Sequence, residues 1–243
     1  MIKAEKIVKT YPSPGGPKTI LNGVNFAVGA GEICVVAGPS GSGKSTLLNI
    51  LGLLDRPDSG SLFINSIDAS LMKPEEILAF RNEKIGFVFQ HHFLIPELDA
   101  WRNIAYPGAL KEGGFSEKLK ERAMELLDFL KLGSLAYSYP ETFSGGESQR
   151  IAAARAVFNA PELLIMDEPT GSLDMASKSD VINLILALNR VSKITAVIAT
   201  HDDFVKKSCG RVFELAAKPA GNSQASRIIS LLPPGRAGIK RPL

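Results

Sequence analysis

Residues 38–46 read GPSGSGKST and match the pattern G-x-x-x-x-G-K-[ST]. Glycines let the backbone curl, so that successive N–H groups point at an anionic group at the start of a helix. Lys44 would then reach the outer phosphates of a nucleotide, and the Ser45 hydroxyl would be a ligand of Mg²⁺. The rest of the predicted phosphate cradle consists of Gly38, Ser40, Gly41, Ser42, Gly43 and Thr46.

The stretch LLIMDEP, residues 163–169, is an apolar run that ends in two carboxylates. A buried strand of an open α/β sheet would place these acids at its carboxyl end, where the ligands of such sheets bind. Asp167 suits the coordination shell of Mg²⁺. Glu168 suits the polarisation of a water for attack on a γ-phosphate, because phosphoryl transfer needs positioning and charge stabilisation more than covalent help.

Two more polar side chains end apolar runs. His201 follows ITAVIAT, which predicts a γ-phosphate contact at the same sheet edge, and Gln90 ends GFVFQ, from where it could reach the metal or the attacking water. His91 and His92 come next. Because no third ligand is evident, we interpret them as part of an interaction loop and not as a metal site.

A second glycine element, FSGGESQR at residues 143–150, opens onto another helical segment roughly a hundred positions after the first. Its candidate phosphate-contacting residues are Ser144, Gly145, Gly146 and Glu147. The first cradle is already complete, so the sequence raises the question of whose phosphate the second element serves.

Apolar spacing predicts the elements that must hold these residues. EICVVAG, bounded by glycines, predicts a strand buried on both faces of a parallel sheet. KSTLLNILGLL predicts a helix whose stripe of Leu47, Leu51 and Leu54 ends at Arg56-Pro57. SEKLKERAMELLDFLKLG predicts a helix capped by Ser116 and stopped by Gly133. The pattern as a whole indicates an α/β core interrupted by a helical lobe.

Composition fits one large globular domain: 243 residues, 45% hydrophobic and 22% charged. No apolar run approaches the ~18 residues of a membrane span, and the N-terminus has no signal-peptide pattern. The two cysteines have no CxxC spacing, which favours reduced thiols over a disulfide or a metal site. Cys34 is predicted to be a buried thiol in a strand. We therefore expect a cytoplasmic protein.

The net charge of +3 comes from the C-terminal end of the chain, residues 218–243. Five basic residues and no acidic one lie there, and removing those five from 28 leaves 23 basic against 25 acidic residues. Such a tail could touch anionic lipid or nucleic acid, or be a solvated, flexible end; its Pro, Gly and Ser content favours the flexible end. We expect a domain over 1–217, with a core of 1–90 and 158–217 and a helical subdomain of 91–157.

Taken in order, GPSGSGKST, Gln90, FSGGESQR, LLIMDEPTGSLD and His201 resemble the Walker A, Q-loop, signature, Walker B with D-loop, and H-loop of an ABC-transporter ATPase subunit. Tyr11 resembles the aromatic residue that stacks on adenine in that family, and Asp174 belongs to the D-loop. Phe143, Ser148 and the D-loop sequence GSLD depart mildly from the family pattern, and none of these is a charged catalytic position.

The resemblance implies a P-loop NTPase (RecA-like) core with an N-terminal antiparallel β segment and an inserted α-helical subdomain. It implies ATP and Mg²⁺ as ligands and a head-to-tail homodimer, in which Ser144, Gly145 and Gly146 cover the ATP of the other copy. Integral membrane permease subunits would dock near Gln90–Ile104, at the cytoplasmic face of the bacterial inner membrane. This segment would expose Phe93, Leu94, Ile95 and Trp101, with packing of some of these side chains in the core as the alternative. No nucleic acid is expected.

Within the family, LLDRPDSG, RNEKIGFVFQHHFLIPELDAWRNIAYP and DEPTGSLD most resemble the LolD/MacB/FtsE group. The implied function is lipoprotein release of the LolD kind, with MacB-type peptide or macrolide efflux and FtsE-type cell-division activity as alternatives. Non-transport ABC ATPases fit less well, because the chain has one cassette and no sustained heptads between Gln90 and Ser144.

Overall fold

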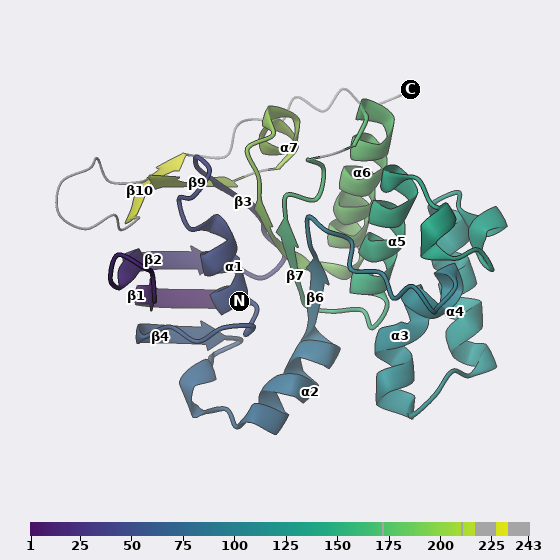
Figure 1. The fold of residues 1–243 in the computed structure, drawn as a ribbon, viewed down its shortest axis with the longest axis horizontal. Helices are drawn as coiled ribbons and strands as arrows, with labels where there is room; N and C mark the ends of the chain where they lie inside the picture. Colours follow the sequence, from purple (N-terminus) through teal and green to yellow (C-terminus); the bar gives the residue numbers. More distant parts are fainter. Residues whose placement is uncertain (172, 210, 217–226, 233–243) are drawn as a thin grey trace. The chain divides into compact units, whose positions relative to one another are not determined.

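The computed structural model describes residues 1–171, 173–209, 211–216 and 227–232 (Figure 1). The strands are β1 (Ile2–Tyr11), β2 (Lys18–Val28), β3 (Ile33–Ala37), β4 (Ser59–Ile64), β5 (Ile67–Asp68), β6 (Ile85–Val88), β7 (Leu163–Asp167), β8 (Thr195–Ala199), β9 (Arg211–Ala216) and β10 (Arg227–Leu232). The helices are α1 (Lys44–Leu51), α2 (Pro74–Lys84), α3 (Ala100–Glu112), α4 (Glu117–Phe129), α5 (Gly145–Val157), α6 (Met175–Ser192) and α7 (Asp203–Ser208), with 3₁₀ turns at Ala69–Leu71, Gly133–Leu135 and Pro140–Thr142. Among the described residues, no helix is both long and apolar enough to cross a membrane.

The chain divides into two compact units. The first consists of residues 1–73 together with the described residues from 195 onward, and the second of residues 74–194. The second unit contains β6 and β7 as well as helices α2 to α6, so it is larger than the predicted helical subdomain of 91–157. That finer division stays a prediction.

The first unit begins with an antiparallel sheet of order β2-β1-β4-β5, in which β1, β2 and β4 lie side by side (Figure 1). Ile2 pairs with Val28 of β2 and with Ile64 of β4. Alternating residues of β1, including Ile2 and Ala4, point into the core, as a half-buried strand requires. The N-terminal antiparallel segment is therefore confirmed.

The same unit holds the strands that carry the nucleotide motifs. β3 pairs in parallel with β8 on one side and with β9 on the other. Cys34 to Ala37 of β3 are all buried, as the run EICVVAG predicts for a strand covered on both faces. Cys34 is thus a buried strand thiol, and burial raises its pKa.

Helix α1 is shorter than its leucine stripe predicts. It ends at Leu51, with Gly52 as its C-cap, and Leu54 lies beyond the helix with 37% of its surface exposed. Leu53, at φ 60, turns the chain back before Arg56-Pro57 is reached. The helix stop that we predict from Pro57 is therefore wrong by one turn.

In the second unit, β6 and β7 pair in parallel. Along the chain, α2 precedes β6, helices α3 to α5 lie between β6 and β7, and α6 follows β7. Ser116 caps α4 through its hydroxyl, as predicted, by accepting the Leu119 N–H. Gly133 is not the stop, because α4 ends at Phe129. Lys131, at φ 59, takes the left-handed conformation that a glycine would adopt more easily.

The predicted tail falls mostly on residues outside the described ones. Within it, residues 227–232 form β10, which pairs antiparallel with β9. The sequence predicts a flexible end and no strand at these residues. The parallel strands, the antiparallel segment and the helices together confirm the predicted α/β fold of the P-loop NTPase kind.

Candidate nucleotide site

The loop between β3 and α1 has the backbone that a phosphate cradle requires. Gly38 has φ 154, and a Cβ there would lie 2.4 Å from the carbonyl oxygen of Leu215. Gly43, the N-cap of α1, has φ 91, and a Cβ there would lie 2.9 Å from the Ile20 side chain. Any other residue at either position would meet both strain and a clash, so the glycines are set by the fold.

The cradle opens at the N-terminus of α1, whose first turn contains no acidic residue. Ser40, Gly41 and Ser45 are exposed there, and Thr46 is half-buried. Lys44 donates from Nζ to the carbonyl oxygens of Gly38 (2.9 Å) and Pro39 (3.2 Å). A cation and a helix N-terminus thus meet at one loop, which suits a polyphosphate. The Ser42 side chain is buried.

His201 lies at the edge of the sheet where the cradle begins. β8 runs parallel to β3, Ala199 pairs with Val36, and the Thr200 N–H donates to the Val36 carbonyl (3.2 Å). The exposed His201 comes immediately after Thr200, on the carboxyl side of both strands. His201 therefore lies at the carboxyl edge of the strands of the first unit, and its contact with a γ-phosphate stays a prediction.

In the second unit, Gln90 and the two acids follow the carboxyl ends of two neighbouring parallel strands. β6 and β7 are parallel, with Val88 opposite Met166, so both chains emerge at the same end. Asp167 is the last residue of β7 and is half-buried, and Gln90 is exposed two residues after β6 ends. This arrangement suits a metal ligand set of oxygen atoms.

Glu168 has an unusual backbone. Its φ of 45 lies in the left-handed region, which costs a residue with a side chain roughly 1 kcal/mol. The Gly171 N–H donates to the Glu168 carbonyl (3.2 Å), which closes the turn that holds this conformation. Strain of this kind gathers at functional sites, where it fixes the direction of a side chain.

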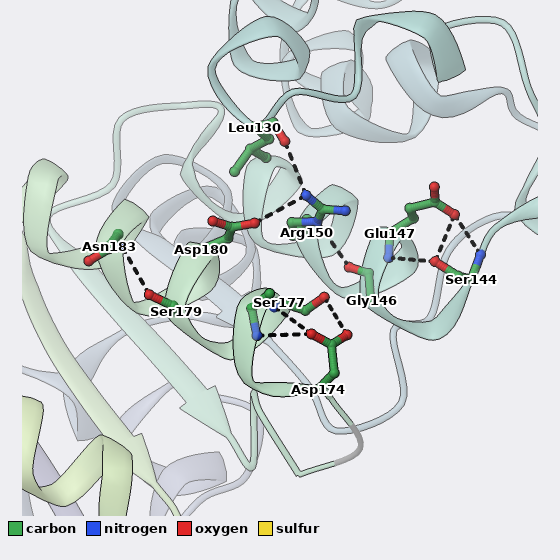
Figure 2. Close-up of polar contacts among 11 residues, drawn as sticks. Leu130, Ser144, Gly146, Glu147, Arg150, Asp174, Ser177, Ser179, Asp180 and Asn183 are labelled. Atoms are coloured by element: carbon green, nitrogen blue, oxygen red, sulfur yellow. Dashed lines mark hydrogen bonds and ion pairs between the residues drawn. The ribbon is translucent and has the colours of Figure 1, made fainter.

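The second glycine element forms the start of α5 (Figure 2). The Ser144 hydroxyl accepts the Glu147 N–H (3.3 Å), and the Glu147 carboxylate accepts the N–H and the hydroxyl of Ser144 (both 2.7 Å). These bonds form a capping box, and they hold the pKa of Glu147 below its ordinary value. The helix therefore presents an exposed Ser144 and Gly145 in a fixed geometry.

Gly146 joins this helix start to α6. A Cβ at position 146 would lie 2.7 Å from the Ser177 Oγ. Ser177 donates from its hydroxyl to Asp174 (2.9 Å), and Asp174 accepts the N–H groups of Ala176 (2.9 Å) and Ser177 (3.0 Å), as Figure 2 shows in part. Asp174 is thus the N-cap of α6, and these bonds lower its pKa. Its predicted contact with nucleotide stays a prediction.

Arg150, the last residue of the motif FSGGESQR, is a functional candidate to which the sequence pattern gives no role. Its guanidinium donates to Asp180 of α6 (3.3 Å), to the Leu130 carbonyl (3.3 Å) and to the Gly146 carbonyl (3.4 Å) (Figure 2). Arg150 therefore connects the first turn of α5, through the Gly146 carbonyl, to Asp180 of α6. The pattern S-x-x-E at Ser144–Glu147 could have predicted the capping box, whereas no local pattern signals Asp180.

The loop after Gln90 is held by α5. Arg155 donates to the carbonyl oxygens of His92 and Phe93 (both 2.7 Å), and His92 Nδ1 lies 2.5 Å from Gln149 Oε1. Phe93 remains 63% exposed. His92 is therefore part of a loop that is hydrogen-bonded to α5, the helix that Ser144 caps.

Trp101 contradicts one prediction. It lies in the first turn of α3 with only 5% of its surface exposed, packed edge-on against Phe115. Leu94 and Ile95 are half-buried, and only Phe93 is well exposed. Trp101 is thus core, because Asp99 caps α3 and turns that face of the first turn inward.

Comparison with known proteins agrees with this geometry. Residues 21–171 match the family described as ABC transporter. The chain is 44% identical over 215 residues to the lipoprotein-releasing system ATP-binding protein LolD of Bacteroides thetaiotaomicron, covering 88% of this chain and 96% of that protein. It is 39% identical over 216 residues to the macrolide export ATP-binding/permease protein MacB of Burkholderia cenocepacia, covering 89% of this chain and 31% of that protein.

Among solved structures, the chain resembles a dimeric, post-hydrolysis state of the ATP-binding cassette MJ0796 bound to ADP and Pi. The TM-score is 0.87 at 35% identity, covering 96% of this chain and 98% of that one. This chain belongs to the ATP-binding subunits of ABC transporters. It is an ATPase of the LolD/MacB group, as its motifs predict.

Proposed function

We propose that two copies of this chain pair head to tail, so that the cradle of one copy and Ser144–Glu147 of the other hold each ATP between them. The observation that carries this proposal is the open space beside Gly145. A Cβ there would meet no described atom within 4 Å, so the chain's own packing does not require a glycine. Glycine in a helix costs up to about 1 kcal/mol relative to alanine. A phosphate that approaches from outside the chain explains its presence.

The relatives support the same arrangement. The MJ0796 cassette, with which this chain shares its fold, is described as dimeric and bound to ADP and Pi. The exposed capping box of α5 offers backbone N–H groups and a positive helix end to such a ligand. A complete cradle in the first unit needs no second one from the same chain, so the second serves the partner's nucleotide.

Within each site we propose distinct roles for the remaining residues. Ser45, Gln90 and Asp167 hold Mg²⁺, Glu168 polarises the attacking water, and His201 contacts the γ-phosphate. The oxygen donors of this set suit Mg²⁺, which prefers hard ligands and retains several waters. Tyr11 stacks on adenine.

We further propose that a membrane permease subunit docks on the loop after Gln90. A groove of about 450 Å³ lies beside this loop, lined by exposed Leu78, Phe93 and Leu110 and by Arg81. Arg81 packs its guanidinium over the Phe87 ring (5.8 Å), and its Nε is buried without a hydrogen-bond partner among the described residues. Apolar anchors around a cation suit an amphipathic segment that carries a carboxylate.

Docking at this loop would reach the signature through α5. Arg155 and Gln149 hold the loop, and the same helix begins with the Ser144 capping box. A displacement of the loop by the permease would therefore move α5, and with it the residues that cover the partner's ATP. This rigid connection is how a permease could sense and use nucleotide-driven closure.

The transported cargo follows from the relatives and not from this chain's own residues. Identity is higher to LolD than to MacB, and the alignment covers nearly the whole of LolD. We therefore propose a lipoprotein-release system, with the subunit at the cytoplasmic face of the bacterial inner membrane. MacB-type export and FtsE-type activity are the alternatives.

The docking proposal is tested by Phe93→Glu, with Phe129→Glu as the matched control. Phe129 is similarly exposed (58%) but lies at the end of α4, away from the groove's lining residues. Each variant is reconstituted in proteoliposomes with its membrane permease subunits. We expect Phe93→Glu alone to lose most of the stimulation of ATP hydrolysis by those subunits. Equal stimulation in both variants would contradict this docking site, and release of a lipoprotein rather than export of a macrolide would distinguish the LolD and MacB alternatives.

A further inference from the structure

The segment after α1 links the phosphate cradle to the end of β1. At its beginning, the Asp55 N–H donates to the Asn49 carbonyl (3.2 Å) in the last turn of α1. At its end, the Asp58 carboxylate accepts the Thr10 N–H (2.6 Å). Residues 53–58 are thus bonded both to the helix that begins at the cradle and to the strand that ends with Tyr11.

The Asp55 carboxylate bridges two side chains of β1. One oxygen accepts the Lys9 ammonium (2.7 Å) and the other accepts the Tyr11 hydroxyl (2.7 Å). Lys9 is only 9% exposed; its ammonium donates also to the Arg56 carbonyl (2.7 Å) and lies 5.2 Å from the centre of the Tyr11 ring. The Lys9 ammonium, the Asp55 carboxylate and the Tyr11 hydroxyl therefore form one hydrogen-bonded group at the end of the Tyr11 ring.

The hydroxyl end of the Tyr11 ring lies near the cradle itself. The Thr46 side chain in the first turn of α1 is close enough to the Tyr11 hydroxyl to offset part of the rise in its pKa. Burial and the Asp55 carboxylate raise the pKa of Tyr11 to about 12, so the hydroxyl remains a donor at any physiological pH. Burial would by itself raise the pKa of Asp55, but the bonds from Lys9 and Tyr11 outweigh it and keep that pKa below its ordinary value.

A purely structural role does not account for this carboxylate. The fastening of residues 53–58 to β1 is already provided by Asp58 and by backbone bonds. Asp55 contributes something different, because it holds the far end of an aromatic side chain whose other end is fixed in a strand. A ring held in one orientation before its ligand arrives loses little rotamer freedom on binding.

We propose that Asp55, supported by Lys9, is a positioning residue of the nucleotide site that holds the Tyr11 ring ready to stack on the base of ATP. The inference rests on the proposed function in one respect, that Tyr11 is the residue that contacts adenine. The group then sets the part of the affinity that comes from the base, and leaves the part that comes from the phosphates to the cradle.

The test compares two probes, Mg-ATP and Mg-tripolyphosphate, by calorimetry on the full-length chain. Tyr11→Phe removes only the hydroxyl, Asp55→Asn removes the charge, and the third variant carries both changes. We expect each single change to weaken ATP about threefold to tenfold, the range of one net hydrogen bond. Tripolyphosphate affinity should not change. The double variant should be no weaker than the weaker single variant, because both changes break one interaction.

Two controls separate the possible failures. Asp58→Asn changes the neighbouring carboxylate, which accepts the Thr10 N–H and forms a longer, half-exposed ion pair with Lys9 (3.7 Å) but makes no hydrogen bond to Tyr11 among the described residues, and it should leave ATP affinity within about twofold. Tyr11→Ala removes the ring and should weaken ATP binding more than Tyr11→Phe does, by about fivefold to 150-fold, because base stacking is lost.

The outcomes that overturn the inference are distinct from those that overturn the proposed function. If Tyr11→Ala weakens ATP but Tyr11→Phe and Asp55→Asn do not, the ring stacks without positioning and Asp55 has no such role. Equal weakening of ATP and tripolyphosphate, or additive effects in the double variant, would also refute positioning. If Tyr11→Ala binds ATP like the unchanged chain, Tyr11 does not contact the base and both the inference and that part of the proposed function fail.

Discussion

Asn103 offers a quantitative test of how the loop after Gln90 is held. Its side chain is fully buried in the first turn of α3. The amide oxygen accepts the Ile95 N–H (2.8 Å), and the amide nitrogen donates to the carbonyl oxygens of Leu98 (2.7 Å), Ile95 (3.0 Å) and Asp99 (3.2 Å). One side chain therefore closes the loop of 95–99 onto the helix that follows it.

The expected cost of Asn103→Ala follows from these bonds. Each net hydrogen bond contributes about 1 kcal/mol, and a buried N–H left without a partner costs about 1–3 kcal/mol. Because water has no access at a fully buried position, we expect a loss of about 3 kcal/mol in the free energy of unfolding. That corresponds to an apparent melting temperature roughly 6–12 °C lower for a chain of this length.

Urea unfolding and hydrogen exchange measure the two parts of this prediction. The exposed Asn183, which donates to Ser179 (3.2 Å) in its own helix and to no other residue among those described, is the matched control. Asn183→Ala should change the free energy of unfolding by less than about 0.5 kcal/mol. The Ile95 amide should exchange faster in Asn103→Ala and not in the control. A loss below about 1 kcal/mol, or unchanged exchange at Ile95, would refute the reasoning.

Two further predictions concern the chemistry and the pH dependence of the site. Glu168→Gln keeps the size of the side chain and removes its charge, so Mg-ATP binding should persist while phosphate release falls about a hundredfold or more; normal turnover would remove Glu168 from the catalytic role. The pKa of Glu147 is lowered from its ordinary value of 4.5 by the bonds from Ser144, so its contribution to stability is full above that value and disappears as pH falls through the lowered pKa. The difference in unfolding free energy between the unchanged chain and Glu147→Gln should therefore shrink below pH 4.5, and a difference that does not vary with pH would contradict the capping box.

Local patterns predicted the parts of the site that depend on neighbouring residues. The glycines of the cradle and the Ser116 cap are set by backbone conformation within a few positions, so their sequence signals survive folding. The parallel strands carried clear apolar runs because both of their faces are buried. These local features are sufficient to predict the α/β fold class.

The predictions failed where distant packing overrides a local signal. No helix was predicted over residues 100–112, where the dipeptide Pro107-Gly108 is typical of a turn, yet α3 continues through it. A Cβ at Gly108 would lie 2.6 Å from the Phe158 ring and 2.7 Å from Leu119, so helix packing requires a glycine there inside a helix. With the helix missed, Trp101 was placed in an exposed loop.

Long-range polar contacts were equally invisible. Tyr11 and Asp55 are 44 positions apart, and Arg150 and Asp180 are 30 apart. A single sequence contains no periodicity that pairs such residues, because each partner is chosen by the fold. The structure therefore contributes the positioning of the site, and the sequence its chemistry.

The central claim, that two copies share each ATP, is tested most directly in tandem fusions that force a defined dimer. The two lesions are Lys44→Ala in the cradle and Ser144→Arg at the exposed start of α5. The readout is ATP occluded per dimer, which does not depend on whether hydrolysis needs two working sites.

Placing one lesion in each half leaves one shared site doubly broken and the other intact, so we predict about one ATP occluded per fused dimer. Placing both lesions in the same half breaks each shared site once, so we predict no occlusion. If each copy instead built its own site, the two results would be exchanged. Occlusion confined to the fusion with both lesions in one half would contradict the head-to-tail dimer.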